Sequence, residues 1–182
     1  MRIVAGKYRG KKLFTPDYEG VRPTSERARE ALFSILYSRL GGLGECKVLD
    51  IFAGTGAFGL EALSRGAAKV AFVDKNPKLL NKNTALFLPE KDKIKIIAAD
   101  ALRLPPAAEA YNLIFSDAPY AQNLSEKAIR EAAAKGWIAP GALCLIETRK
   151  DEELALPENF AQVDERIYGI AKISFYIYNQ AD

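Results

Sequence analysis

Histidine is entirely absent from this chain of 182 residues. Its absence excludes Ser-His-Asp and Cys-His nucleophile systems and every metal centre with histidine ligands. Any proton acceptor must therefore be a carboxylate, a lysine, a tyrosine or the backbone. Cysteine is scarce too: Cys46 and Cys144 stand far apart, with neither the spacing of a zinc site nor the density of a disulfide framework. We expect both to be buried in a reducing compartment, and we expect no metal site.

Long apolar runs are also missing. No segment is long enough to span a membrane, and the N-terminus has no apolar stretch of signal-peptide length. The sequence therefore predicts a cytoplasmic protein without membrane contact. With 182 residues and 49% apolar content, the chain suits one domain with a real core. No long apolar stripe is left over for an oligomer interface, so a monomer is expected.

Acidic residues are missing from the first 15 positions, which hold five cations with Tyr8 and Phe14 interleaved. The cations are Arg2, Lys7, Arg9, Lys11 and Lys12. Residues 1–30 carry a net charge of +4, so the local excess exceeds the +3 of the whole chain. This pattern is expected of a surface that binds phosphates and bases. A solvated, partly frayed arm is the alternative.

The order of strands and helices predicts an α/β fold. Residues 2–5 and 11–14, separated by Gly6 and Gly10, indicate a β-hairpin, and we expect a basic hairpin extension over 1–20 and a single domain over 21–182. A helix should run from a Thr24 or Ser25 cap to Leu40, with further helices over 57–65, 77–88 and 125–135. Strands are predicted over 47–53, 69–74, 93–99, 111–117, 142–148, 163–169 and 171–178. Alternation of this kind requires right-handed crossovers, hence a seven-stranded, mostly parallel sheet with an antiparallel last strand.

The strand over 47–53 runs directly into a glycine turn, Gly54-x-Gly56-x-x-Gly59. Glycine lets the backbone pass close to a ligand, and the next helix offers unpaired N–H groups at its start. The spacing matches the dinucleotide fingerprint, with Asp74 about 20 residues on, so a nicotinamide or flavin enzyme is one interpretation. However, Asp50 places a carboxylate before the turn, where a pyrophosphate would be repelled and a cation would be attracted. A plain tight turn between strand and helix is the third possibility.

In its carboxylate followed by a glycine turn, the sequence resembles the S-adenosylmethionine-dependent methyltransferases. The cofactor of these enzymes carries an amino group and a sulfonium. The resemblance implies a Rossmann-like class I fold with S-adenosylmethionine as the cofactor. Three predicted strands end in a carboxylate, at Asp50, Asp74 and Asp100, and a fourth runs into Asp117. Since ligands bind at the carboxyl ends of strands in an open α/β sheet, we expect these four residues to define the active edge.

The segment Asp117-Ala118-Pro119-Tyr120 resembles the Asp-Pro-Pro-Tyr motif of amino-group methyltransferases. An exocyclic amine conjugated to a base is a poor nucleophile, and acceptors on its N–H groups help to expose its lone pair. The Asp117 carboxylate and the Ala118 carbonyl could be those acceptors, while Tyr120 stacks on the base. Ala118 stands where the family has its first proline, which restores an N–H and loosens the turn. An ordinary proline turn with a half-buried tyrosine is the alternative.

The N-terminal sequence, with its basic segment and Arg22-Pro23-Thr24, resembles the N-terminal signature of bacterial small-subunit rRNA guanine-N2 methyltransferases. The resemblance to this family extends over nearly the whole chain. The resemblance implies methylation of a guanine in 16S rRNA, free or in the assembling 30S subunit. Its cofactor residues would be Asp50, Phe52, Gly54, Gly56, Asp74, Lys75, Asp100 and Ala101. Its catalytic residues would be Asp117, Ala118, Pro119 and Tyr120. Its RNA contacts would be Arg2, Lys7, Arg9, Lys11, Lys12, Arg22 and Thr24.

Three other functions are compatible with these residues. An N6-adenine or glutamine-amide methyltransferase would use the same kind of amine-binding motif. A dinucleotide-dependent oxidoreductase would use the same glycine spacing. A non-catalytic RNA-binding module would keep the fold and the basic segment, and Ala118 is the residue that suggests it.

Overall fold

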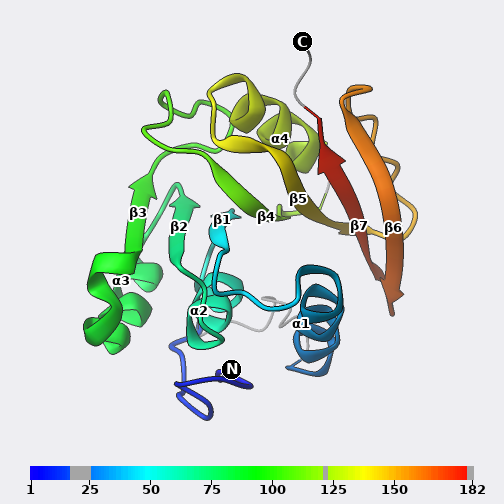
Figure 1. Ribbon diagram of the computed structural model, residues 1–182. Coiled ribbons are helices and arrows are strands. Elements are labelled where there is room, and N and C mark those ends of the chain that lie inside the picture. Colours follow the sequence, from blue (N-terminus) through cyan, green and yellow to red (C-terminus); the bar gives the residue numbers. More distant parts are fainter. Residues whose placement is uncertain (17–25, 121–122, 180–182) are drawn as a thin grey trace.

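The computed structural model describes residues 1–16, 26–120 and 123–179, which form an α/β fold around one sheet (Figure 1). Within these residues the sheet has seven strands in the order β3-β2-β1-β4-β5-β7-β6, and only β7 runs antiparallel to its neighbours. The strands are β1 Lys47–Ile51, β2 Lys69–Asp74, β3 Ile94–Ala98, β4 Tyr111–Asp117, β5 Ile138–Arg149, β6 Phe160–Tyr168 and β7 Ala171–Tyr178. The helices are α1 Glu26–Leu40, α2 Ala57–Ser64, α3 Lys78–Thr84 and α4 Leu124–Ala134, with a 3-10 segment η1 Ala85–Lys93. The predicted fold class is confirmed.

Helices cover both faces of the sheet. Successive strand residues point to opposite faces, so Val48 and Leu49 are both fully buried but belong to two different apolar clusters. One cluster lies between the sheet and α1, α2 and α3, and the other lies between the sheet and α4 (Figure 1). Burial on both sides explains why the central strands read as continuous apolar runs. Cys46 and Cys144 are both buried, as expected.

The strand order reverses between β1 and β4. The chain builds the sheet outward from β1 through β2 to β3, then returns to place β4 on the other side of β1. In open α/β sheets the two crossovers at such a point leave a crevice at the carboxyl ends of the strands. Residues at the ends of β1 and β4 are therefore placed to share a ligand.

Several predicted boundaries differ from the structure; β6, for example, begins at Phe160 and not at 163. The helix expected over 77–88 is α3 followed by η1, because Phe87 leaves helical geometry (φ −115, ψ 34) and turns its ring into the core. Pro89, the residue after the predicted helix, lies inside η1. Strand β5 begins at Ile138, earlier than the predicted 142, since Ile138 pairs with Tyr111 before a register shift near Pro140 and Gly141 (φ +77). A proline followed by a glycine gives no sequence signal for a strand.

The N-terminal segment folds back on itself. The N–H groups of Gly10 and Leu13 donate to the carbonyls of Ile3 and Met1, and the N–H of Ile3 donates to the carbonyl of Lys11. A single antiparallel bridge joins Arg2 to Lys12, where the sequence suggested two short strands. Ile3 and Leu13 are buried in the same cluster as α2, so these residues pack on the domain and do not form a frayed arm. The boundary expected at residues 20–21 lies outside the described residues. Within the described ranges, no helix combines the length and the apolar character needed to cross a membrane.

Candidate active site

The turn after β1 provides an open stretch of backbone. Phe52, Gly54 and Gly56 all have positive φ values, of 60°, 56° and 76°. Built on Gly54, a Cβ atom would have only the carbonyl oxygen of Phe52 near it, at 3.9 Å, so a ligand can approach this backbone. Built on Gly56, a Cβ atom would lie 2.6 Å from Cδ1 of Leu80. Gly54 therefore leaves room for a ligand, whereas Gly56 is required by packing inside the protein.

A glycine is required at position 59 by packing inside the protein. A Cβ atom there would lie 2.4 Å from Phe72 Cε1 and 2.7 Å from Val70 Cγ1, both on β2. The glycine therefore allows α2 to pack closely against the sheet. The third glycine of the predicted turn serves helix packing, and its backbone N–H binds Asp50.

Asp50 is a carboxylate buried under the turn. Only 2% of the residue is exposed, and Oδ2 accepts a hydrogen bond of 3.0 Å from the N–H of Gly59. Burial raises the pKa of Asp50 well above its ordinary value, and the negative charges of Asp117 and Asp74 raise it further, against the opposing effect of the Gly59 hydrogen bond. A cationic group beside Asp50 would relieve this cost.

Asp50 and Asp117 line the same pocket, of about 200 Å³. The pocket lies between the glycine turn, α1 and the ends of β1 and β4. Its lining residues are Met1, Arg29, Leu32, Asp50, Phe52, Ala53, Gly54, Thr55, Ala57, Phe58, Phe115 and Asp117. It thus combines apolar walls with two carboxylates and one guanidinium. Four of the predicted site residues meet here: Asp50, Phe52, Gly54 and Asp117.

The predicted residues after β2 and β3 lie beyond this pocket along the same edge. Asp74 accepts hydrogen bonds of 2.7 Å from the N–H groups of Gly54 and Asn76, one on each oxygen. Asp100 accepts one of 3.0 Å from the N–H of Leu102, and its other oxygen lies 4.0 Å from Nζ of Lys75. Each carboxylate oxygen can accept a further hydrogen bond. The edge therefore presents fixed acceptors next to the open backbone of Gly54.

The end of β4 leads directly into the Asp-Ala-Pro-Tyr segment. Ala118 is buried, Pro119 is exposed and Tyr120 is half-buried. The hydroxyl of Tyr120 donates a hydrogen bond of 3.2 Å to Oε1 of Glu147 on β5. Glu147 was not among the predicted site residues, although it also follows an apolar strand, the signal that identified Asp117. In the sheet it is the direct neighbour of Asp117.

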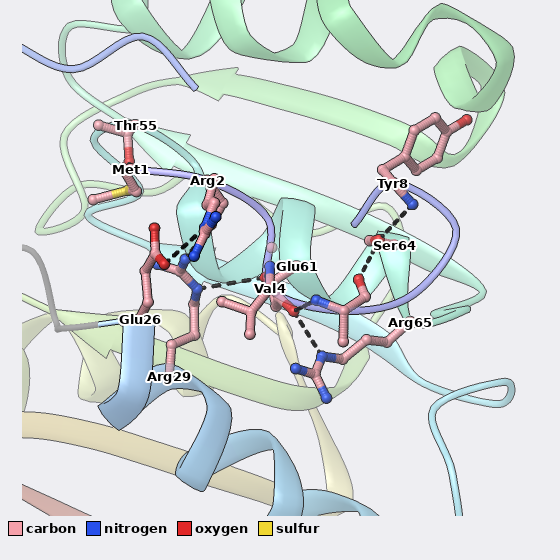
Figure 2. A network of polar contacts seen from close by, with 12 residues as sticks. Met1, Arg2, Val4, Tyr8, Glu26, Arg29, Thr55, Glu61, Ser64 and Arg65 are labelled. Atoms are coloured by element: carbon pink, nitrogen blue, oxygen red, sulfur yellow. Dashed lines mark hydrogen bonds and ion pairs between the residues drawn. The ribbon is translucent and has the colours of Figure 1, made fainter. Parts of the chain in front are cut away.

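Glu61 on α2 ties the N-terminal segment to the pocket wall (Figure 2). Its fully buried carboxylate accepts hydrogen bonds from the N–H groups of Val4 (2.7 Å) and Ala5 (2.9 Å) and from Nε of Arg65 (2.8 Å). Nε of Arg29 lies 3.5 Å away as an ion-pair partner. An acid inside a helix gave no sequence signal for this role, because its partners lie far away in the chain.

Further contacts fix the same segment. The N–H of Tyr8 donates to Oγ of Ser64, and that hydroxyl donates to the carbonyl of Ala5 (Figure 2). A guanidinium N–H of Arg29 donates to the carbonyl of Arg2. Since Met1 and Arg29 both line the pocket, the basic segment and the candidate active site are joined through α1 and α2.

The five N-terminal cations fall into two groups. Arg2 pairs with Glu26, Lys7 with Glu90, and Lys11 donates to the carbonyl of Leu86. Arg9 and Lys12 have exposed side chains, and in the described part of the chain no ion pair is found for them. The remaining two predicted RNA contacts, Arg22 and Thr24, lie outside the described residues. Within residues 1–16, 26–120 and 123–179, no group of three His, Cys, Asp or Glu side chains could hold a metal.

The site residues fit S-adenosylmethionine by their chemistry. Asp50 suits a cationic amino-acid end, and the backbone of Gly54 is open beside it. Asp74 suits ribose hydroxyl groups, and Asp100 next to the buried Ala101 suits an adenine amine. By contrast, the pyrophosphate of a dinucleotide would meet two carboxylates in this pocket.

Several known proteins are similar to this chain in sequence and in fold. The family described as Conserved hypothetical protein 95 matches residues 1–177. The ribosomal RNA small subunit methyltransferase D of Haemophilus influenzae is 36% identical over 182 residues, which cover 97% of this chain and 93% of that protein. Its namesake from Escherichia coli K12 is 32% identical over 185 residues, covering 99% and 90%. The solved structure of a putative methyltransferase from Escherichia coli has a TM-score of 0.82 at 30% identity, covering 98% of each chain. The chain therefore belongs to the Conserved hypothetical protein 95 family, among the small-subunit rRNA methyltransferases, and has the Rossmann-like class I methyltransferase fold.

Proposed function

We propose that this protein transfers a methyl group from S-adenosylmethionine to the exocyclic N2 amine of a guanine in 16S rRNA. The observation that carries the proposal is the pocket that Asp50 and Asp117 line together beside the open backbone of Gly54. Asp50 suits the cationic end of the cofactor, and Asp117, the last residue of β4, begins the segment that would bind the amine. The names of the relatives support an rRNA substrate.

The cofactor would be held along the carboxyl edge of the sheet. Asp50 would face its amino group, Gly54 would contact it through the backbone, and Asp74 would accept from the ribose hydroxyls. Asp100 and Ala101 would hold the adenine, with Lys75 at the exposed rim of this part of the site. When bound, S-adenosylmethionine supplies an electrophilic methyl group on a sulfonium.

The target amine would be held at the end of β4. The Asp117 carboxylate and the Ala118 carbonyl would accept hydrogen bonds from its two N–H groups, which directs the nitrogen lone pair away from the base plane. Asp117 would also take up the proton that the nitrogen loses, directly or through water. The ring of Tyr120 would stack on the base. A base of folded rRNA must be unstacked to reach these residues.

The N-terminal segment would bind the phosphates near the target base. Arg9 and Lys12 are the strongest candidates, because both are exposed and are not used in ion pairs within the described residues. Arg2, Lys7 and Lys11 also hold the segment in place. Arg2 and Lys7 still expose more than half of their side chains, so they can take part in both roles.

The test is methylation with labelled S-adenosylmethionine. Naked 16S rRNA and partly assembled small subunits are incubated with the protein, and the products are analysed as nucleosides. The expected product is N2-methylguanosine. Label in N6-methyladenosine, label in protein only, or tight NADH binding without binding of S-adenosylmethionine would each refute the proposal.

Asp117→Ala is the variant that tests the mechanism. We expect the rate of methyl transfer to fall at least about 100-fold. The variant removes the carboxylate that accepts a hydrogen bond from the amine and that takes up its proton. Calorimetry should give an affinity for S-adenosylmethionine within about threefold of the wild type. An unchanged rate in this variant would contradict the role of Asp117.

A further inference from the structure

We propose that Glu147 is a positioning residue that fixes the ring of Tyr120 for methyl transfer. The proposal rests on the proposed function, since it concerns the orientation of the base that Tyr120 stacks on. Glu147 lies at the carboxyl end of β5 and does not belong to the Asp-Ala-Pro-Tyr segment. Only 6% of the residue is exposed, and its carboxylate accepts a hydrogen bond from the hydroxyl of Tyr120.

Glu147 is held in a rigid part of the sheet. It pairs in register with Asp117 of β4 on one side and with Ile173 of β7 on the other. In-register residues of neighbouring strands point to the same face of the sheet, so the side chains of Glu147 and Asp117 lie on the same face. A group attached to Glu147 is therefore fixed relative to Asp117.

Tyr120 needs such an attachment. It follows β4 by three positions, beyond the exposed Pro119, where no strand pairing determines the orientation of its side chain. A carboxylate only accepts hydrogen bonds, so the tyrosine hydroxyl must donate its hydrogen to Glu147. The bond fixes the position of the hydroxyl oxygen and so limits χ1 of Tyr120. Because a phenolic O–H prefers the plane of its ring, the direction of the bond also restrains χ2.

The consequence concerns the alignment of the target nitrogen. With its hydroxyl bound to Glu147, Tyr120 presents the face of its ring to a base, and that face keeps a constant position relative to the acceptor at Asp117. Small losses of alignment reduce a transfer rate strongly, because the reacting atoms must lie in line at near contact distance. Glu147 therefore acts on the rate of transfer through Tyr120, without touching the cofactor.

A double-mutant cycle tests this coupling. Tyr120→Phe removes the hydroxyl and keeps the ring, and Glu147→Met removes the carboxylate at similar volume. We expect each variant to reduce the single-turnover rate about tenfold, and the double variant to be no slower than either one. Affinity for S-adenosylmethionine should stay within twofold. Glu147→Gln should keep at least a third of the rate, because its amide oxygen still accepts the hydroxyl.

The outcomes separate the two proposals. If the wild-type protein forms no N2-methylguanosine, the proposed function fails and this inference fails with it. If the wild type is active but the losses in the double variant multiply to about 100-fold, Glu147 does not act through Tyr120 and only this inference fails. Should Glu147→Met not fold, Tyr120→Phe decides alone: a rate within twofold of the wild type overturns the inference.

Discussion

At the scale of single residues, the buried carboxylate of Asp50 lowers the free energy of unfolding of the protein. Its pKa is raised in the folded state, so its favourable contribution is complete below the pKa of an unfolded aspartate and is lost as the pH rises through the folded value. At neutral pH the folded protein thus contains a group that would be more stable uncharged. We expect Asp50→Asn to raise the free energy of unfolding at neutral pH by about 1 kcal/mol, or about 2–4 °C in Tm.

Thermal melts across a pH series check this prediction. The increase in the free energy of unfolding should vanish in acid, below the ordinary pKa of aspartate, where Asp50 and the asparagine that replaces it are both neutral. The amide oxygen of asparagine can still accept the Gly59 N–H, so geometry is retained. Calorimetry should give the opposite trend for ligand binding, with S-adenosylmethionine about tenfold weaker, which corresponds to about 1.4 kcal/mol. A variant that is less stable at neutral pH would contradict the explanation.

At the scale of the elements, one buried acid joins α1, α2 and the N-terminal segment. Glu61 accepts from the backbone of that segment and pairs with Arg29 and Arg65 (Figure 2). Glu61→Gln keeps the volume but removes the nearest counter-charge of the buried Arg29 and the largely buried Arg65. We expect a loss of about 3–5 kcal/mol in the free energy of unfolding. Affinity for S-adenosylmethionine should fall as well, because Met1 and Arg29 line the pocket.

Glu26→Ala provides the matched control. Glu26 also pairs with the N-terminal segment, through Arg2, but both side chains are exposed by more than a third. Solvent screens such a pair, so its loss should lower the free energy of unfolding far less than the loss of Glu61 does. Chemical denaturation of the two variants measures the difference. Equal losses would mean that burial of Glu61 is not what holds the segment.

At the scale of the whole molecule, the charges that meet RNA should lie on the side of the N-terminal segment. Reversal of two exposed cations in Arg9→Glu/Lys12→Glu should weaken RNA binding and lower the slope of log affinity against log salt by about 1–2, with Tm unchanged. Lys127→Glu/Lys135→Glu makes the same change in net charge on α4, which covers the other face of the sheet (Figure 1). Filter binding at several salt concentrations measures the RNA affinity of the two double variants. Equal effects would indicate a general charge effect and no local RNA surface.

How far the sequence predicts this molecule depends on the range of each interaction. The apolar runs with Asp50, Asp74 and Asp117 at their ends predict the sheet and its active edge, because strand direction alone brings those residues together. The role of Glu61 depends on partners distant in the chain, such as Val4, and no local pattern indicates it. The apolar run before Glu147 indicates a strand but does not indicate the contact with Tyr120. The break at Phe87 has the same origin, since contact with the core overrides the helical pattern.

The order of the last three strands has a consequence for synthesis of the chain. β6 precedes β7 in the sequence but lies outside it, at the edge of the sheet. A growing chain therefore cannot place β6 until residues 171–178 have left the ribosome and inserted beside β5. Until then the open edge of β5 can pair with a foreign strand. A nascent copy of this protein is thus exposed to mispairing until its final strand emerges.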